Sequence, residues 1–212
     1  MTTSDFKTAL VIGATGLVGN NLVRQLTESA LYERVTVLTR RPLAWQHPRL
    51  QETNYDFDRP NSLLVQADHI FCCLGTTIRQ AGSRDAFRKV DYQYPMDIAQ
   101  MGRSNGASLF AIVTSMGADA ASTFFYNRVK GEVERDLAAL NYPALLVFRP
   151  SLLLGQRRNF RLGERVGEGF MRLLAPLIPA KYRAVEASSV AAAMIKYVKE
   201  GESGVFDSDL LR

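Results

Sequence analysis

Ala9-Leu10-Val11-Ile12-Gly13-Ala14-Thr15-Gly16-Leu17-Val18-Gly19 is the most informative stretch of this chain. Its four leading apolar residues predict a buried strand, and the apolar residues after the last glycine recur at helical spacing. Glycines between a strand and a helix permit a sharp turn, close approach of the backbone to a pyrophosphate, and tight packing of the helix on the strand. We therefore expect a dinucleotide site, with the pyrophosphate bound by Gly13, Ala14, Thr15, Gly16, Leu17, Val18 and Gly19 at the helix N-terminus.

The glycine spacing leaves two other interpretations to weigh. Ala14 stands where the Gly-x-Gly-x-x-Gly fingerprint has its middle glycine, and three glycines can also form a simple tight turn. A phosphate-loop NTPase is disfavoured because no Gly-Lys-Ser/Thr follows. The strand before the turn and the helix after it favour the dinucleotide site.

Composition indicates one globular domain over residues 1–212. The chain is 47% hydrophobic and 22% charged, and no apolar stretch reaches the roughly 18 residues of a membrane span. The polar start lacks a signal region, so we expect a cytoplasmic protein without a membrane partner. Cys72 and Cys73 are adjacent, which suits neither a disulfide framework nor a zinc site, and we expect core residues and no metal.

Strands and helices alternate along most of the chain, which predicts an α/β fold: a Rossmann-type, doubly wound parallel sheet with a small C-terminal substrate lobe. Ligands of such sheets bind at the carboxyl ends of the strands. The expected strands are Thr8 to Ile12, Arg34 to Leu38, Leu50 to Tyr55, Asp68 to Leu74, Ser108 to Thr114, Ala144 to Phe148 and Gly204 to Phe206. The expected helices are Gly16 to Glu28, Ser62 to Gln66, Asp85 to Gly102, Ser122 to Leu140, Val166 to Leu174 and Ser188 to Lys199.

The alternation stops after Arg149-Pro150, where we expect residues 155–185 to form a substrate lobe or lid. Residues 156–183 hold seven basic and two acidic side chains, so this segment accounts for the whole net charge of +5. A solvated surface explains such a segment as well as an anionic substrate, partner or nucleic acid does.

Two motifs at strand ends suggest which nucleotide binds. An NAD site usually places a carboxylate after the second strand, but this chain has Thr39-Arg40-Arg41-Pro42. Paired guanidinium groups favour a 2′-phosphate, so we expect NADP (NADPH) rather than NAD. After the third strand, Asp56 and the adjacent Phe57 are candidates for the adenine, although Asp56 and Asp58 also suit a turn or a helix cap.

Tyr126 and Lys130 are the candidate acid-base pair. At i and i+4 they share one helix face, and a nearby ammonium favours the phenolate of a tyrosine. The same spacing also occurs on solvated helix faces. Ser115 follows the preceding strand and could hydrogen-bond a carbonyl oxygen while Tyr126 transfers its proton.

The glycine turn, the strand-end Ser115, Tyr126-x-x-x-Lys130 and Arg149-Pro150 occur in the order typical of the short-chain dehydrogenase/reductase superfamily. The chain is similar to its short, atypical branch. Within that branch, Phe71-Cys72-Cys73-Leu74-Gly75-Thr76-Thr77, Thr114-Ser115-Met116-Gly117-Ala118-Asp119 and Tyr126 to Glu134 resemble the HIV Tat-interacting protein family of NADP-binding oxidoreductase-like proteins. The resemblance covers nearly the whole chain.

The resemblance implies a role for each matching residue. Tyr126 would be the general acid-base, assisted by Ser115, and Lys130 would hold the nicotinamide ribose. Two features depart from the family pattern: ten residues separate Ser115 from Tyr126, fewer than in the commonest reductases, and Asp91 stands where relatives often carry asparagine. The adenosine and its ribose would lie against Leu74, Gly75 and Thr76, and the nicotinamide against Pro150 and Ser151.

The leading hypothesis is an NADP-dependent oxidoreductase that transfers hydride to or from a carbonyl or alcohol substrate. The basic segment, residues 156–183, is compatible with an anionic substrate. The alternatives are a non-enzymatic NADPH-binding redox sensor and a sugar-nucleotide epimerase-like enzyme. Nucleic acid is a less favoured partner. A homodimer through the helix expected over Ser122 to Leu140 is a further hypothesis.

Overall fold

One parallel sheet organises the protein, for which a computed structural model describes residues 6–154 and 182–212. Its seven strands lie in the order β3-β2-β1-β4-β5-β6-β9, and every neighbouring pair is parallel. The order reverses between β1 and β4, which confirms the predicted doubly wound Rossmann topology. The strands are β1 (Lys7–Ile12), β2 (Tyr32–Thr39), β3 (Leu50–Asn54), β4 (His69–Cys72), β5 (Leu109–Val113), β6 (Ala144–Arg149) and β9 (Gly204–Asp207).

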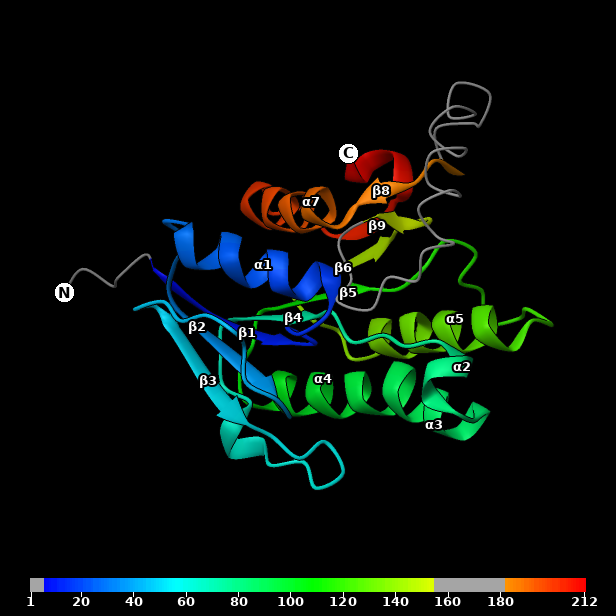
Figure 1. Ribbon diagram of the computed structural model, residues 1–212, viewed down its shortest axis with the longest axis horizontal. Coiled ribbons are helices and arrows are strands. Elements are labelled where there is room, and N and C mark those ends of the chain that lie inside the picture. Colours follow the sequence, from blue (N-terminus) through cyan, green and yellow to red (C-terminus); the bar gives the residue numbers. More distant parts are fainter. Residues whose placement is uncertain (1–5, 155–181) are drawn as a thin grey trace.

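Helices cover both faces of the sheet (Figure 1). On one face lie α1 (Leu17–Glu28) and α7 (Ala187–Glu200), and on the other lie α4 (Tyr94–Ser104) and α5 (Phe125–Ala138). Short helices α2 (Ile78–Ala81) and α3 (Arg84–Arg88) follow β4 and lie near the start of α5. Among the described residues, no helix has both the length and the apolarity needed to cross a membrane.

The sheet separates two hydrophobic cores because alternate strand residues point to opposite faces. Ala9 and Val11 pack with α1 and α7, whereas Leu10 and Ile12 pack with α4 and α5. Cys72 is buried in the second core and Cys73 packs against the first, so both cysteines are unpaired packing residues, as predicted.

The helix expected over Asp85 to Gly102 forms in three parts. After α3 the backbone makes a π-helical turn, η2 (Lys89–Gln93), before continuing as α4. A π turn inserts one extra residue and changes the direction in which nearby side chains point. It lies at Asp91, whose side chain is buried.

The helix expected from Ser122 begins later, at Phe125. The Asp119 carboxylate accepts from the amide of Ala121 and the Ser122 hydroxyl accepts from the amide of Phe124, so these side chains hold a turn in place of a first helical turn. The segment expected as a helix from Ser62 to Gln66 is only a 3-10 turn, η1 (Ser62–Leu64). A final 3-10 turn, η5 (Ser208–Leu211), follows β9.

A second, two-stranded parallel sheet was not predicted. β7 (Leu153–Leu154) pairs with β8 (Val185–Glu186) and so brings together two segments far apart in the sequence. Of the substrate lobe or lid expected over residues 155–185, only residues 182–185 are described. The helix expected from Val166 to Leu174 lies outside the described residues.

Candidate functional site

The turn between β1 and α1 is held against the end of β4. Gly13 has φ +81°, and a β-carbon on it would lie 2.4 Å from the Cys73 carbonyl carbon and oxygen. A β-carbon on Gly19 would lie 2.3 Å from the Gly13 oxygen. Two of the three glycines are therefore required by the packing of the turn itself.

Gly16 is different, because its β-carbon would meet only the Gly13 oxygen, at 3.2 Å, and the Cys73 oxygen, at 3.9 Å. Gly16 is the N-cap of α1, and among the described residues no side-chain hydrogen bond caps the N-terminus of this helix. Its first amides therefore remain available to an anion. The turn fits the pyrophosphate of a dinucleotide, held by the amides that follow Gly16.

The loop after β4 contacts the glycine turn at one end and lies near Lys130 at the other. A β-carbon on Gly75 would lie 3.7 Å from Asp91 Oδ1 and 3.9 Å from Lys130 Nζ. The amide of Thr76 donates to Asp91 Oδ2 at 3.0 Å. Leu74, next in the chain to Cys73, packs partly buried against the second core. Three residues expected at the adenosine and its ribose thus connect the glycine turn with the predicted Tyr-Lys pair.

Lys130 and Asp91 form a buried ion pair. Lys130 Nζ lies 2.7 Å from Asp91 Oδ1, and their side chains are 4% and 0% exposed. Burial lowers the pKa of Lys130, but the Asp91 carboxylate, together with Tyr126, raises it above its ordinary value. Burial also raises the pKa of Asp91, against the opposing effects of Lys130 and the Thr76 amide. Lys130 therefore keeps its proton at neutral pH.

Tyr126 lies one helical turn before Lys130 on α5, and its ring packs against Phe87 at 5.3 Å between centroids. Tyr126 is partly exposed. The Ser115 hydroxyl oxygen, just beyond β5, is buried and has no hydrogen-bond partner among the described residues. A buried hydroxyl without a partner is available to a substrate oxygen.

Backbone contacts hold the loop after β5 between α5 and the end of β6. The amide of Asp119 donates to the Asn127 oxygen at 3.1 Å, and the amide of Met116 donates to the Pro150 oxygen at 3.0 Å. A β-carbon on Gly131 would lie 2.1 Å from the Ala120 nitrogen, so the loop packs directly on α5. Ser115 is thereby held between two predicted site elements, those of Tyr126 and Pro150.

Ser151 differs from the other predicted site residues because its hydroxyl is occupied. It donates to the Arg183 carbonyl oxygen and accepts from the Ser208 hydroxyl at 2.9 Å, and the Ser151 amide donates to the same Ser208 oxygen at 3.1 Å. These bonds connect the end of β6 with the segment before β8 and with η5. Any contact of Ser151 with a nicotinamide would compete with them.

Glu134 continues the helix stripe of Tyr126 and Lys130 by one more turn and is also buried. The Thr114 hydroxyl donates to Glu134 Oε1 at 2.5 Å, and Arg149 binds both Glu134 oxygens from the end of β6. This cluster fixes Thr114 at the end of β5. Since Thr114 directly precedes Ser115, the cluster also fixes the backbone from which the Ser115 side chain extends.

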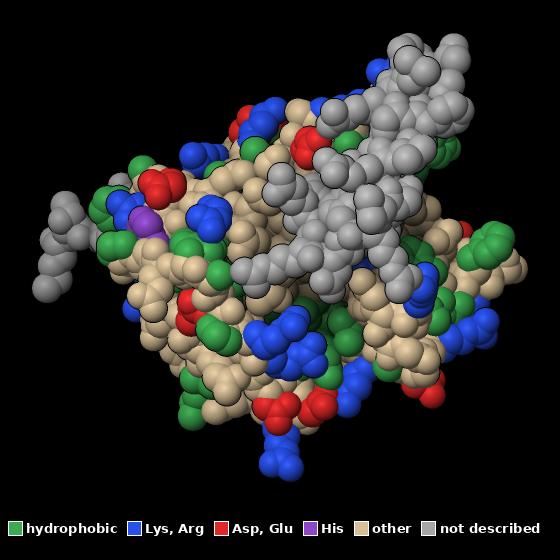
Figure 2. All heavy atoms as spheres, in the orientation of Figure 1, with side chains coloured by type: hydrophobic (Ala, Val, Ile, Leu, Met, Phe, Trp, Pro, Cys, Tyr) green, Lys and Arg blue, Asp and Glu red, His purple; other side chains and the backbone are tan. Residues whose placement is uncertain are grey.

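Arg40 and Arg41 follow β2 and are both exposed. The Thr39 hydroxyl fixes their turn by donating to the Arg41 oxygen at 2.7 Å, and neither arginine takes part in an ion pair within residues 6–154 and 182–212. Figure 2 shows Lys and Arg side chains gathered near the centre of the visible face. Both guanidinium groups therefore fit a 2′-phosphate.

The adenine candidates after β3 have different surroundings. Asp56 is exposed, and its Oδ1 accepts from the Asp58 amide at 2.9 Å. One of its two carboxylate oxygens therefore stabilises the turn. The Phe57 ring is buried between Tyr55 and Tyr94. The Asp58 carboxylate pairs with Lys89, 2.8 Å away, and with the Tyr94 hydroxyl, which attaches this loop to the start of α4.

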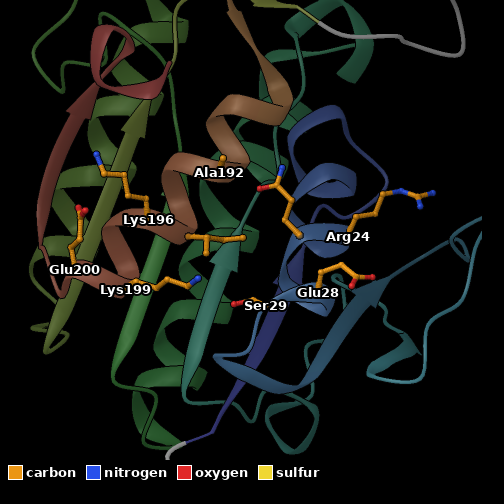
Figure 3. Close-up of a pocket in the computed structure, with 9 residues that line it drawn as sticks. Arg24, Glu28, Ser29, Ala192, Lys196, Lys199 and Glu200 are labelled. Carbon is orange, nitrogen blue, oxygen red and sulfur yellow. The ribbon is translucent and has the colours of Figure 1, made fainter.

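A groove of about 630 Å³ lies away from these residues, between α1 and α7 (Figure 3). It contains none of the predicted site residues and is lined by Arg24, Gln25, Glu28, Ser29, Ala192, Ile195, Lys196, Lys199 and Glu200.

Two buried residues of the site, Asp91 and Glu134, are not among the site residues that the sequence predicts. The i+4 and i+8 spacing of Lys130 and Glu134 from Tyr126 could have indicated a shared helix face. The partners of that face, however, come from other elements.

The sequence matches the family model described as HIM1 over residues 29–173. Protein HTATIP2 of Rattus norvegicus is 34% identical over 204 residues, which cover 93% of this chain and 84% of that protein. Protein FMP52, mitochondrial, of Candida glabrata is 33% identical over 208 residues, which cover 93% of this chain and 89% of that protein.

Solved structures share the fold at low sequence identity. The UDP-N-acetylglucosamine 4-epimerase from Methanobrevibacter ruminantium M1, in complex with UDP-N-acetylmuramic acid, has a TM-score of 0.73 at 13% identity, covering 95% of this chain and 76% of that one. MoeE5 in complex with UDP-glucose and NAD has a TM-score of 0.71 at 16% identity, covering 94% of this chain and 74% of that one. These similarities show the Rossmann fold.

Proposed function

Because the chain belongs to the HIM1/HTATIP2/FMP52 family and has a Rossmann fold, we propose that it is an NADP-dependent oxidoreductase of the short-chain dehydrogenase/reductase type. Its substrate would be a carbonyl compound or the corresponding alcohol. The supporting observation is that Gly75, in the loop expected to line the adenosine, lies beside Lys130 of the Tyr-Lys pair. This contact supports a site in which the residues expected at the nucleotide lie close to the candidate acid-base pair.

The residues that would hold the cofactor lie along the carboxyl ends of β1, β2 and β4. The amides after Gly16 suit the pyrophosphate, Arg40 and Arg41 suit the 2′-phosphate, and Lys130 suits the hydroxyls of the nicotinamide ribose. When bound, NADP(H) would accept hydride from an alcohol carbon or supply it to a carbonyl carbon.

The chain's own residues would handle the proton and the developing charge. In the reducing direction, Tyr126 gives its phenolic proton to the substrate oxygen, and the Ser115 hydroxyl donates a hydrogen bond to the same oxygen. In the oxidising direction, Tyr126 takes the alcohol proton. Lys130 follows Tyr126 by one helical turn on α5 and supplies the positive charge of the pair.

Calorimetry with NADPH, followed by a panel of carbonyl substrates, tests this proposal. We expect NADPH binding, turnover of at least one substrate, and a loss of about 100-fold or more in kcat for Tyr126→Phe. Full turnover by that variant would contradict the mechanism. NADPH binding without turnover, combined with a partner whose affinity changes with NADPH, would favour the regulatory alternative. A chain that binds no NADPH would contradict both.

A further inference from the structure

Asp91 occupies an unusual position in the helical segment after β4. It lies in the π-helical turn η2, between α3 and α4, and its side chain is fully buried. A carboxylate without solvent needs hydrogen-bond donors or a counter-ion, because desolvation of its charge is costly. The π turn places Asp91 where two such groups come from different elements.

The two carboxylate oxygens of Asp91 have separate partners. Oδ2 accepts from the Thr76 amide at 3.0 Å, and Oδ1 lies 2.7 Å from Lys130 Nζ. One side chain thus connects the loop after β4 with α5. Asp91→Asn removes the charge beside Lys130, while the amide oxygen of the asparagine can still accept from the Thr76 amide, so the two roles can be separated by mutation.

Lys130 depends on this carboxylate for its charge. Burial by itself lowers the pKa of a lysine, and Asp91 is the main group that opposes this effect at Lys130. Two other titratable groups act on Lys130: Tyr126 from the same helix and Cys72 from β4. Burial raises the pKa of Cys72 to about 12, so this thiol is neutral near pH 7 and cannot replace the Asp91 charge.

We propose that Asp91 is a positioning residue that holds the Lys130 ammonium group between the Gly75–Thr76 loop and Tyr126. The inference rests on the proposed function for its consequence, since Lys130 is the residue expected at the nicotinamide ribose. The effect of Asp91 on the Lys130 pKa can be measured whether or not the protein turns over a substrate. Without Asp91, a buried Lys130 would lose its proton at a lower pH, and the site would lose its cation under alkaline conditions.

The test is a measurement of the Lys130 pKa by NMR in the intact chain and in the Asp91→Asn variant. Selective labelling of the lysine side chains gives the signal, and Lys130→Gln identifies it. We expect the pKa of Lys130 to fall by at least about one unit in Asp91→Asn. An unchanged Lys130 pKa would overturn the proposal.

Asp136→Asn is the matched control. Asp136 lies on α5, as Lys130 does, and accepts from the Tyr92 hydroxyl of the same π turn at 2.7 Å. This variant also removes a carboxylate between α5 and η2, but the partners of Asp136 are Tyr92 and Arg135. It should leave the Lys130 pKa unchanged, and an equal shift in both variants would contradict a specific role for Asp91.

NADPH titrations give a second measurement. The pH above which NADPH affinity begins to fall should be at least about one unit lower in Asp91→Asn than in the intact chain, because Lys130 deprotonates earlier in the variant. Equal pH profiles would overturn the proposed link with the cofactor. If the intact chain binds no NADPH, the proposed function fails, but the NMR titration still decides the role of Asp91.

Lys130→Gln keeps the proposal testable if Asp91→Asn does not fold. Without the Lys130 ammonium group, the pKa of Asp91 in the folded chain should rise further. As the pH increases, Asp91 would then lose its proton in the unfolded chain before it does so in the folded chain. The free energy of unfolding of Lys130→Gln should then decrease relative to the intact chain as the pH rises above about 4. The absence of such a decrease would show that the two groups are not coupled.

Discussion

Gly13 lies so close to the Cys73 backbone that a β-carbon at Gly13 would be 2.4 Å from the Cys73 carbonyl oxygen. This contact joins the turn after β1 to the end of β4, at the point where the strand order reverses. The glycine is required here for packing as well as for φ +81°. The same turn therefore contributes both to the stability of the fold and to the shape of the proposed nucleotide site.

We expect Gly13→Ala to lower the free energy of unfolding by about 3 kcal/mol or more, because backbone atoms cannot move aside as a flexible side chain can. Urea denaturation measures the change. Gly16→Ala is the matched control, since its β-carbon would meet its nearest atom at 3.2 Å. It should cost about 1 kcal/mol but weaken NADPH binding. Equal losses of stability would show that the close contact with Cys73 does not matter.

Glu134→Gln should lower the free energy of unfolding by about 2 kcal/mol, because Arg149 and Thr114 both depend on its buried carboxylate. The estimate is below that for a fully buried pair, since the Arg149 side chain is 27% exposed. Thermal unfolding measures the loss. Arg135→Gln, which removes an exposed ion pair with Asp136, should leave stability nearly unchanged. A larger effect of Arg135→Gln would reverse this ranking.

The free energy of unfolding should decrease as the pH is lowered from about 6.5 to about 4, because of His69. Its Nδ1 lies 2.8 Å from the Tyr32 hydroxyl, and burial lowers the pKa of His69 to about 4. In the unfolded chain the imidazole has its ordinary pKa, so acid protonates the unfolded state first and favours unfolding. The expected loss is about 3 kcal/mol across this window.

Urea titrations at pH 7 and pH 5 check this expectation. Replacement of His69 by phenylalanine should remove most of the pH dependence in that interval, even if the variant is less stable at both values. An unchanged slope in His69→Phe would assign the pH dependence to other groups.

Replacement of both Arg40 and Arg41 by alanine should weaken NADPH binding by about 10- to 100-fold and leave NADH binding nearly unchanged, because a 2′-phosphate loses two charge-assisted partners. Calorimetry with the two nucleotides measures the preference. Arg59→Ala is a suitable control, since Arg59 is an exposed arginine of the neighbouring loop after β3. Equal losses for NADPH and NADH would argue against 2′-phosphate recognition.

Features that depend on neighbours along the chain can be predicted from the sequence alone. Apolar strands such as β1 and β5 indicated a sheet buried on both faces, and their alternation with helices indicated parallel connections. The glycine turn followed from residues within one short segment, and so did the i, i+4 spacing of Tyr126 and Lys130. Local backbone geometry fixes such relationships before any long-range contact forms.

Contacts between groups from distant elements depend instead on how the elements pack. Asp91 reaches Lys130 because a π turn redirects it, and Glu134 receives Arg149 because α5 packs beside β6. In the same way, Ser151 is occupied by partners from the segments around β8 and β9. Periodicity in a sequence reports which face of an element is buried. The partner that a buried charge finds there depends on how separate elements pack, because desolvation is offset only by a group at bonding distance.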